Sequence, residues 1–243
     1  SCSAELKAQR NGTVYKGNDP AVRYTGRTLV SSDGSVAFDW VGTYLETRFT
    51  GGRLSVKVSE TGTSYYNVFV DGKLHKVVKV CGTDTLIHLV SGIDKRIHSL
   101  KIQKRSEGEF GKTTIHQFVL SGSGRLAEEP AVRTRHIEFI GNSLTCGYGT
   151  DGKHRDEPFL VETENCNLTF ASMVARYYDA DYTLIAHSGR GAARNYGDSV
   201  RVSKVTMKDR MLNTFDEDLT HKWNFKGYLP DLVVINLGSN DFS

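Results

Sequence analysis

From residue 13 to about residue 120, hydrophobic and polar residues alternate in short runs separated by glycine or Asp-Gly turns. Alternation of this kind predicts β-strands, and helical periodicity is hard to find in this half of the chain. Residues 65–70 and 73–80 flank Asp71 and Gly72 and predict a hairpin. Other strand-like runs lie at 54–58, 85–90, 97–102 and 113–120. About eight strands are expected, and a jelly-roll sandwich is the natural arrangement because paired sheets protect strand edges.

A Ser-Gly-Ser-Gly stretch at 121–124 and a charged segment up to Arg135 predict a linker, and the pattern changes beyond it. Residues 136–140, 182–186 and 232–237 are short apolar runs, and residues 168–178 have helical spacing. Apolar strands that alternate with helices predict a parallel sheet covered on both faces. The sequence thus predicts an all-β domain over 1–130 and an α/β domain over 131–243.

Composition excludes several classes of protein. Hydrophobic residues make up 38% and charged residues 24%, as in an ordinary globular protein. The net charge of +3 comes from scattered basic residues, which argues against nucleic-acid binding. No apolar run reaches the roughly 18 residues of a membrane span, and no intact signal peptide is present.

The four cysteines allow more than one interpretation. Cys2 near the start of the chain resembles the lipid-anchored cysteine of a processed bacterial lipoprotein, although an ordinary terminus is the favoured explanation. Cys81, Cys146 and Cys166 lack metal-ligand spacing, and three is an awkward number for pairing. We expect these three to be free, with a bridge between Cys146 and Cys166 as the alternative.

Each predicted strand of the second domain is followed by a polar motif that contains glycine. The motifs are Gly-Asn-Ser-Leu-Thr at 141–145, His-Ser-Gly-Arg-Gly at 187–191 and Gly-Ser-Asn-Asp at 238–241. Because ligands gather at the carboxyl ends of parallel strands, the three motifs are expected to meet there. Acyl transfer needs a nucleophile and hydrogen-bond donors for the developing oxyanion. Ser143, Gly189 and Asn240 are residues of those types.

These motifs resemble those of the SGNH (GDSL-like) hydrolases, and specifically of carbohydrate esterase family 2, whose members remove acetyl groups from plant polysaccharides. The resemblance covers residues 139–149, 184–191 with 194–197, and 230–243, and it extends to 38–42 and 48–51 in the β-rich half. It implies an N-terminal jelly roll followed by a flavodoxin-like, three-layer SGNH domain. It also implies Ser143 as nucleophile and oxyanion donor, Gly189 as backbone donor and Asn240 as side-chain donor.

The chain departs from this family at two points. Asn142 stands where the family usually has Asp, which removes a charge but keeps hydrogen-bonding ability, so a modest effect on rate is expected. The family's base histidine follows the asparagine motif by many residues, whereas this sequence stops three residues after Asn240. A truncated sequence, or completion by a second polypeptide, would account for this. His154 and His221 mimic the family's Asp-x-x-His spacing but precede the asparagine, and His187 is expected to support the site rather than act as base.

The resulting hypothesis is a secreted, periplasmic or cell-surface serine esterase that acts on an acetylated polysaccharide or oligosaccharide and needs no cofactor or metal. No His, Cys or carboxylate cluster has ligand spacing, and no phosphate loop is present. The competing hypothesis is a non-catalytic carbohydrate-binding protein that stacks sugars on aromatic residues; Trp40, Tyr65, Tyr66 and Trp223 are the candidates. A third interpretation gives the β-domain only a packing role.

Overall fold

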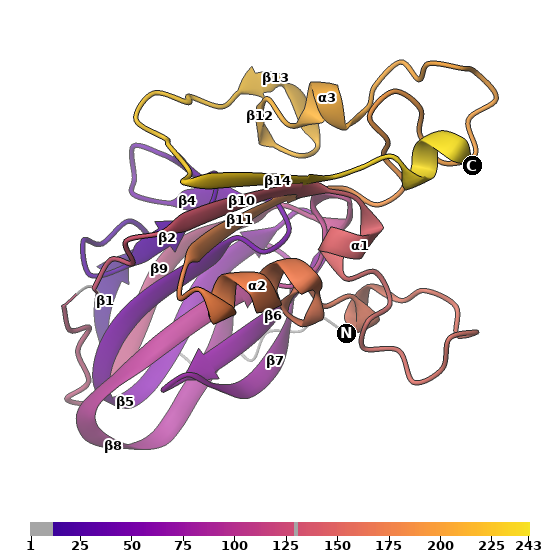
Figure 1. The fold of residues 1–243 in the computed structure, drawn as a ribbon. Helices are drawn as coiled ribbons and strands as arrows, with labels where there is room; N and C mark the ends of the chain where they lie inside the picture. The colour runs from indigo at the N-terminus through magenta and orange to yellow at the C-terminus, as the bar shows by residue number, and fades with distance from the viewer. Residues whose placement is uncertain (1–11, 129–130) are drawn as a thin grey trace.

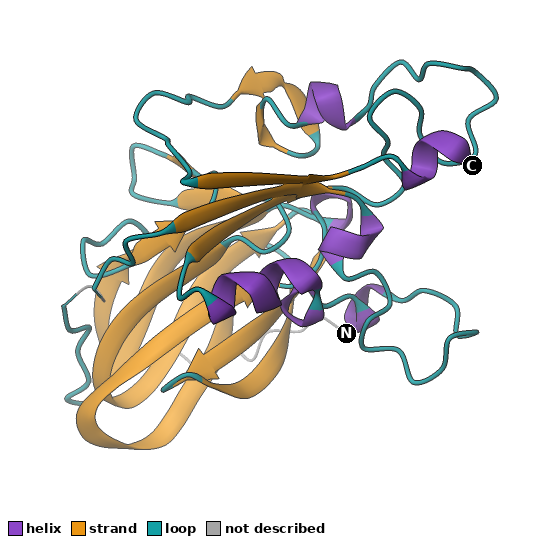
Figure 2. Cartoon of the chain, in the orientation of Figure 1, coloured by secondary structure: helices purple, strands orange, loops and turns teal. Residues whose placement is uncertain are grey.

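The computed structural model describes residues 12–128 and 131–243. Over the first range, nine strands form one hydrogen-bonded antiparallel set around a common core (Figures 1 and 2). They are β1 (Gly12–Lys16), β2 (Arg23–Thr25), β3 (Leu29–Val30), β4 (Val36–Phe38), β5 (Tyr44–Glu60), β6 (Thr63–Val70), β7 (Lys73–Cys81), β8 (Thr85–Lys104) and β9 (Thr113–Ser121). The predicted all-β first domain is confirmed.

Two strands are longer than the sequence pattern indicated. The runs at 85–90 and 97–102 belong to the single strand β8, which pairs with β5 along most of its length. The register of this pair shifts between Thr50 and Ser55, so the ladder absorbs the polar residues that looked like a break. The predicted hairpin joins β6 and β7, and both of its turn residues have positive φ, 50° at Asp71 and 77° at Gly72.

The second range contains the predicted parallel sheet, in the order β11 (Asp181–Ala186), β10 (His136–Gly141) and β14 (Leu232–Asn236). Its short helices are α1 (Ser143–Cys146), α2 (Phe170–Tyr177), α3 (Met207–Arg210) and the 3-10 helices η2 (Val161–Thr163), η3 (Cys166–Leu168) and η4 (Ser239–Phe242). A hairpin of β12 (Asn213–Phe215) and β13 (Asp218–Lys222) completes it. The α/β class is therefore confirmed.

Alternate residues of the parallel strands pack against different layers. Phe139 and Leu184 lie in a core with the α2 alanines, whereas Ile140 and Ile185 pack against Met207 of α3. The β-domain contributes to both cores, through Tyr44 on the first side and Trp40 on the second. Figure 1 shows the parallel sheet between α2 on one face and α3 with the β12–β13 hairpin on the other.

The cysteines correct one expectation. Cys146 and Cys166 are free and buried, so the alternative bridge between them is not formed. Cys81, however, is disulfide-bonded, and the prediction that it is free was wrong. Spacing along a chain carries no three-dimensional distance, so the sequence could not identify its partner. Cys2 lies outside the described residues. Among the described residues, no helix combines the length and hydropathy that a membrane span requires.

Candidate active site

The first strand-end motif forms a tight turn that presents Ser143 at the start of α1. Asn142 caps this helix, and its Oδ1 accepts a hydrogen bond from the Leu144 amide at 3.1 Å. Its Nδ2 donates to Ser239 Oγ at 3.0 Å, which ties the serine turn to the segment that carries Asn240. Gly141 is required because a Cβ there would lie 2.1 Å from Thr145 Oγ1. Asn142 thus keeps the hydrogen-bonding role that the sequence suggested.

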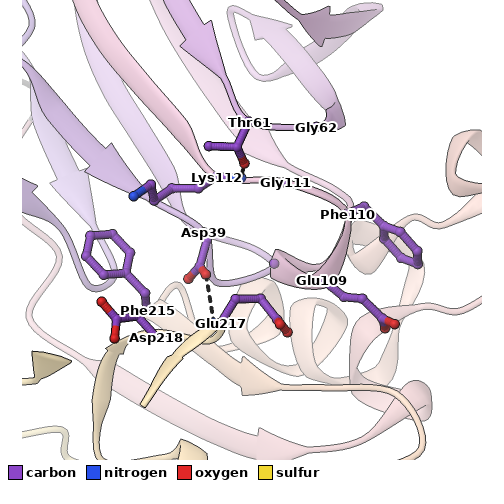
Figure 3. Close-up of a pocket in the computed structure, with 11 residues that line it drawn as sticks. Asp39, Thr61, Gly62, Glu109, Phe110, Gly111, Lys112, Phe215, Glu217 and Asp218 are labelled. Atoms are coloured by element: carbon purple, nitrogen blue, oxygen red, sulfur yellow. Dashed lines mark hydrogen bonds between the residues drawn. The ribbon is translucent and has the colours of Figure 1, made fainter. Parts of the chain in front are cut away.

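The three predicted residues line one open pocket of about 410 Å³. Ser143, Gly189 and Asn240 share its wall with Glu109, Tyr148, Ser188 and Tyr196. They come from the ends of β10, β11 and β14, as the parallel-sheet argument predicted. Glu109 also lines a second hollow beside this pocket (Figure 3).

The loop that carries Gly189 is fixed by residues close to Asn240. The carboxylate of Asp241 accepts hydrogen bonds from the amides of Ala192, Ala193 and Arg194 at 3.0, 2.7 and 2.9 Å. Burial alone would raise the pKa of Asp241, but these amide donors outweigh it, and the pKa lies below its ordinary value. Asn240 Nδ2 donates to the Arg190 carbonyl at 2.9 Å and keeps its second N–H for another acceptor. Gly189 itself has a φ of 78°, which favours glycine.

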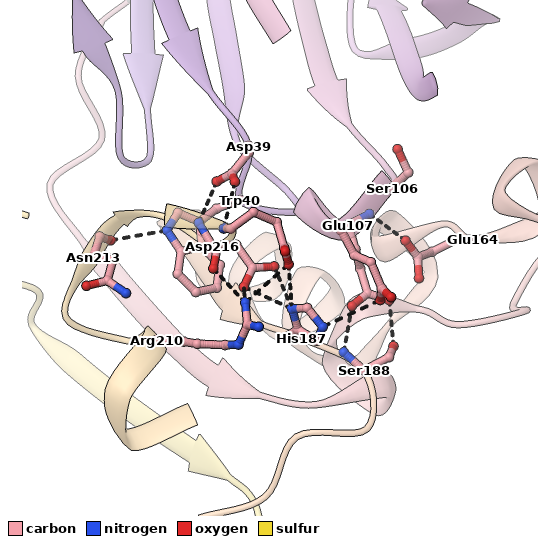
Figure 4. Close-up of polar contacts among 12 residues, drawn as sticks. Asp39, Trp40, Ser106, Glu107, Glu164, His187, Ser188, Arg210, Asn213 and Asp216 are labelled. Carbon is pink, nitrogen blue, oxygen red and sulfur yellow. Dashed lines mark hydrogen bonds and ion pairs between the residues drawn. The ribbon is translucent and has the colours of Figure 1, made fainter. Parts of the chain in front are cut away.

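The β-domain supplies the group that holds Ser188, the neighbour of Gly189. Glu107 follows β8, and its carboxylate accepts hydrogen bonds from the Ser188 amide at 2.6 Å and from Ser188 Oγ at 2.5 Å (Figure 4). The Glu107 amide donates to Glu164 Oε1 at 2.6 Å. Burial raises the pKa of Glu164 to about 11, so Glu164 is protonated at neutral pH. Lys104 Nζ is buried nearby and donates to the carbonyls of Ser106 and Glu107.

His187 lies behind the pocket wall. Its Nδ1 is 2.9 and 2.8 Å from the two carboxylate oxygens of Asp216, and its Nε2 is 3.5 Å from Glu109 Oε2. Burial alone would lower the pKa of His187, but the hydrogen bond and charge of Asp216 outweigh this, and the pKa is raised. Asp216 is also paired with Arg210 at 3.0 Å. Its amide donates to Asp39 of the β-domain at 2.7 Å.

The two other histidines considered from the sequence do not line the pocket. His154 is exposed and lines a different hollow, which shares Tyr148 with the Ser143 pocket. His221 lies on β13, where its Nδ1 is 2.9 Å from Thr214 Oγ1. Neither is among the described residues that line the Ser143 pocket.

Two groups of side chains around His187 have the donors and proximity to hold a metal ion, which sequence spacing did not reveal. One combines His187 with Glu107 and Glu109, and the other combines it with Asp216 and Glu217. The donors are already engaged with one another and with Ser188. In this structure the same donors form a network of hydrogen bonds and ion pairs.

Sequence reasoning missed the contribution of the β-domain to this site. Glu107 and Glu109 lie in the Ser-Glu-Gly-Glu-Phe-Gly stretch at 106–111, where two acidic residues flank a glycine after a long strand. That stretch was the one sequence feature that could have pointed to these residues. Its role becomes clear only from the contact between Glu107 and Ser188 in the folded protein. Tyr148 and Tyr196 fell within the motifs that carried the resemblance, yet their position on the pocket wall could not be read from them.

Comparison with known families agrees with this architecture. The family described as "Carbohydrate esterase 2 N-terminal" matches residues 24–130, and "GDSL-like Lipase/Acylhydrolase" matches residues 137–243. The chain is 34% identical to "Cellulase/esterase CelE" of Acetivibrio thermocellus over 93% of this chain and 27% of that protein. It is 32% identical to an "Acetylxylan esterase / glucomannan deacetylase" of Cellvibrio japonicus, over 90% of this chain and 60% of that protein. The chain thus spans only part of both relatives.

Solved structures give the same result. A family two carbohydrate esterase from Clostridium thermocellum, in complex with cellohexaose, superposes with a TM-score of 0.86 at 35% identity, covering 91% of this chain and 67% of that one. A family two carbohydrate esterase from Cellvibrio japonicus gives a TM-score of 0.85 at 26% identity, covering 96% and 69%.

Proposed function

Because this chain belongs to carbohydrate esterase family 2, we propose that the protein removes O-acetyl groups from a plant cell-wall polysaccharide or oligosaccharide through an acyl-enzyme on Ser143. The observation that carries the proposal is the convergence of Ser143, Gly189 and Asn240 on one pocket from three separate strand ends. A serine that shares a pocket with two such donors has a clear use in acyl transfer. We also propose the boundary between the two domains near residue 130, since strand pairing changes from antiparallel to parallel across it.

In the proposed reaction, Ser143 Oγ attacks the acetyl carbonyl carbon while its proton passes to a base. The resulting oxyanion accepts hydrogen bonds from the Gly189 amide, the free N–H of Asn240 Nδ2 and the Ser143 amide. Collapse of this intermediate expels the sugar oxygen, which takes the proton, and leaves acetyl-Ser143. Water then attacks the acetyl group and releases acetate.

We assign no histidine of this sequence as the base. His154 and His221 do not line the pocket, and His187 is bound by Asp216 on one side and faces Glu109 on the other. We propose instead a histidine from a part of the protein outside these residues.

The proposed substrate class follows from the relatives and from the open pocket. The relatives carry the names cellulase/esterase and acetylxylan esterase / glucomannan deacetylase. At the pocket, the side chains of Tyr148 and Tyr196 are 49% and 71% exposed, and such rings offer flat apolar surface to a sugar. A polymeric substrate of the plant cell wall lies outside the cell, so we propose a secreted, periplasmic or cell-surface protein.

A non-catalytic carbohydrate-binding protein is the second candidate. The observation that favours it is that none of the described histidines lines the Ser143 pocket. The exposed aromatic rings beside Ser143 would serve such a protein equally well. Hydrolysis and binding must therefore be measured separately.

The test measures hydrolysis of 4-nitrophenyl acetate and of acetylated xylan by this chain and by the full-length protein. We expect activity in the full-length protein, and a loss of at least about a thousandfold in its Ser143→Ala variant with cellohexaose binding retained. Full activity in Ser143→Ala would overturn the assignment of the nucleophile. Cellohexaose binding without hydrolysis by the full-length wild type would favour the second candidate.

A further inference from the structure

A second hollow adjoins the Ser143 pocket and is formed by both domains. Its volume is about 410 Å³, and it meets the pocket at Glu109, which lines both. From the β-domain it takes the turn after β5 and the segment around η1 (Gly108–Phe110), and from the second domain it takes the turn between β12 and β13 (Figure 3). The nucleophile, the oxyanion donors and the exposed tyrosines are not part of it.

The two walls are held together at the floor of this hollow. The buried carboxylate of Asp39 accepts hydrogen bonds from the amides of Asp216 and Glu217 at 2.7 and 3.0 Å. Gly108 allows the closest approach, since a Cβ there would lie 2.9 Å from Asp216 Cβ. The hollow is therefore formed before any ligand arrives, which lowers the entropy cost of binding.

The chemistry of the walls suits a neutral polyhydroxyl compound. The side chains of Glu109 and Glu217 are 52% and 44% exposed, and Asp218 joins them as a third carboxylate. Carboxylates accept hydrogen bonds from hydroxyl groups, and each sugar residue carries several hydroxyl groups. Lys112 lies with its Nζ 5.0 Å from the centre of the Phe215 ring and adds a donor. Glu217 is paired with Arg210 at 3.1 Å, and Glu109 lies 3.5 Å from His187 Nε2, so part of their charge is balanced. Asp218 accepts hydrogen bonds from the Thr220 amide and hydroxyl, and its negative charge disfavours an anionic ligand such as a uronic acid.

We propose that this hollow is a subsite for a neutral sugar residue of the same polysaccharide chain whose acetylated residue occupies the Ser143 pocket. The proposal rests on the esterase function proposed above and deepens it. In this proposal the β-domain helps to determine which substrate length and which substrate charge the protein prefers. A chain decorated with uronic acid at this position is bound less well than an undecorated one.

The experiment compares the affinities of cellobiose and cellohexaose by calorimetry, using the full-length protein with Ser143→Ala to prevent turnover. The longer sugar is expected to bind about tenfold more tightly, the value of one or two additional hydrogen bonds. Adding Thr61→Trp, at an exposed residue on the rim, should fill the hollow and abolish this gain without changing the affinity for cellobiose. The control is Ser123→Trp, which adds the same indole at an exposed position after β9.

Charge provides the second measurement. In the wild type, Asp218 Oδ1 accepts a hydrogen bond from the Thr220 amide at 2.9 Å. Asp218→Asn keeps an oxygen that can accept this bond but removes one negative charge. We expect it to raise the affinity for a glucuronic-acid-substituted xylo-oligosaccharide severalfold and to leave cellohexaose nearly unchanged. Asp156→Asn makes the same change at a carboxylate that is 86% exposed elsewhere and should have no effect.

Two results would overturn the subsite. One is equal affinity for cellobiose and cellohexaose in the parent protein, and the other is an unchanged length dependence in Thr61→Trp. Hydrolysis of 4-nitrophenyl acetate by the corresponding proteins with Ser143 intact separates this failure from failure of the proposed function. That small ester does not reach the hollow, so its turnover reports on the Ser143 pocket alone.

Discussion

The interior of the β-domain and its border with the α/β domain are both buried, yet they are built from opposite kinds of residue. The interior is a cluster of valines, leucines, isoleucines and aromatic rings from β4 to β9. At the border, the same domain buries Asn67, Gln103, Lys104, Arg105 and Glu107, each at most 3% exposed. One strand, β8, contributes to both regions.

The difference lies in what each region requires. Apolar burial stabilises without directional demands, so the interior tolerates many combinations of similar volume. A buried polar group must find its partner, and all of these border residues except Lys104 do so across the two domains. Gln103 Nε2 donates to Tyr182 Oη at 2.7 Å, and Arg105 Nε donates to the Glu164 carbonyl at 2.9 Å. The interior therefore stabilises the fold, whereas the border fixes where the β-domain places Glu107 against the Ser143 pocket.

The largest effect on stability is expected from the interior. Phe118 is fully buried there, and Phe118→Ala should lower the free energy of unfolding by about 4 kcal/mol through lost burial and a residual cavity. Denaturant unfolding measures the loss, and kcat/KM per folded molecule should stay near the wild-type value. Phe118→Leu is the matched control and should cost much less. A selective loss of kcat in the folded fraction of Phe118→Ala would break the proposed division between the two regions.

An intermediate effect, mainly on rate, is expected at the border. Glu107→Ala removes the acceptor of both Ser188 hydrogen bonds, so the oxyanion loop loses its support. We expect kcat in the full-length protein to fall about a hundredfold, with a much smaller change in KM. Glu107→Gln retains one carbonyl oxygen as acceptor and should recover most of the rate. A loss of stability in Glu107→Ala without a change in kcat would make Glu107 a structural residue only.

Local sequence patterns predicted the strands and helices of this fold well, because strand alternation and strand-end motifs involve residues that are close together in the sequence. The parallel strands at 136–140, 182–186 and 232–237 were found within a residue or two of their ends. Ser143, Gly189 and Asn240 were placed in one pocket by an argument that used only strand order. The continuity of β8 was missed, since polar residues in its middle resemble a loop.

The rest of the site depends on contacts between distant parts of the chain. Glu107 and Ser188 are 81 residues apart, and no period or spacing relates them. The same is true of Asp39 and Asp216, 177 residues apart, and of Cys81, whose disulfide was not predicted. Sequence patterns indicate which residues of one helix or strand are buried. They do not indicate which polar group of another element forms a hydrogen bond with a buried polar residue.

The smallest effect concerns the pH dependence of the border. Burial raises the pKa of Glu164 from 4.5 to about 11 and that of Asp39 from 3.8 to about 7. Both groups bind a proton more strongly in the folded state. Their contribution to stability is therefore complete below the unfolded pKa values and is lost as the pH rises, through about 7 for Asp39 and on toward 11 for Glu164. The aliphatic and phenylalanine side chains of the interior do not titrate, so their contribution to stability has no such dependence.

Glu164→Gln isolates one of these groups. Its amide oxygen can still accept from the Glu107 amide, and the amide group never ionises. Stability should be close to that of the wild type near pH 5 and should exceed it by about 1 kcal/mol more near pH 6, because only the wild type loses stability over this range, by about 1.4 kcal/mol per pH unit. Denaturant midpoints at the two pH values measure the difference. Parallel curves for the two proteins would mean that Glu164 is already ionised at pH 5, and the border would then hold its charges by pairing rather than by protonation.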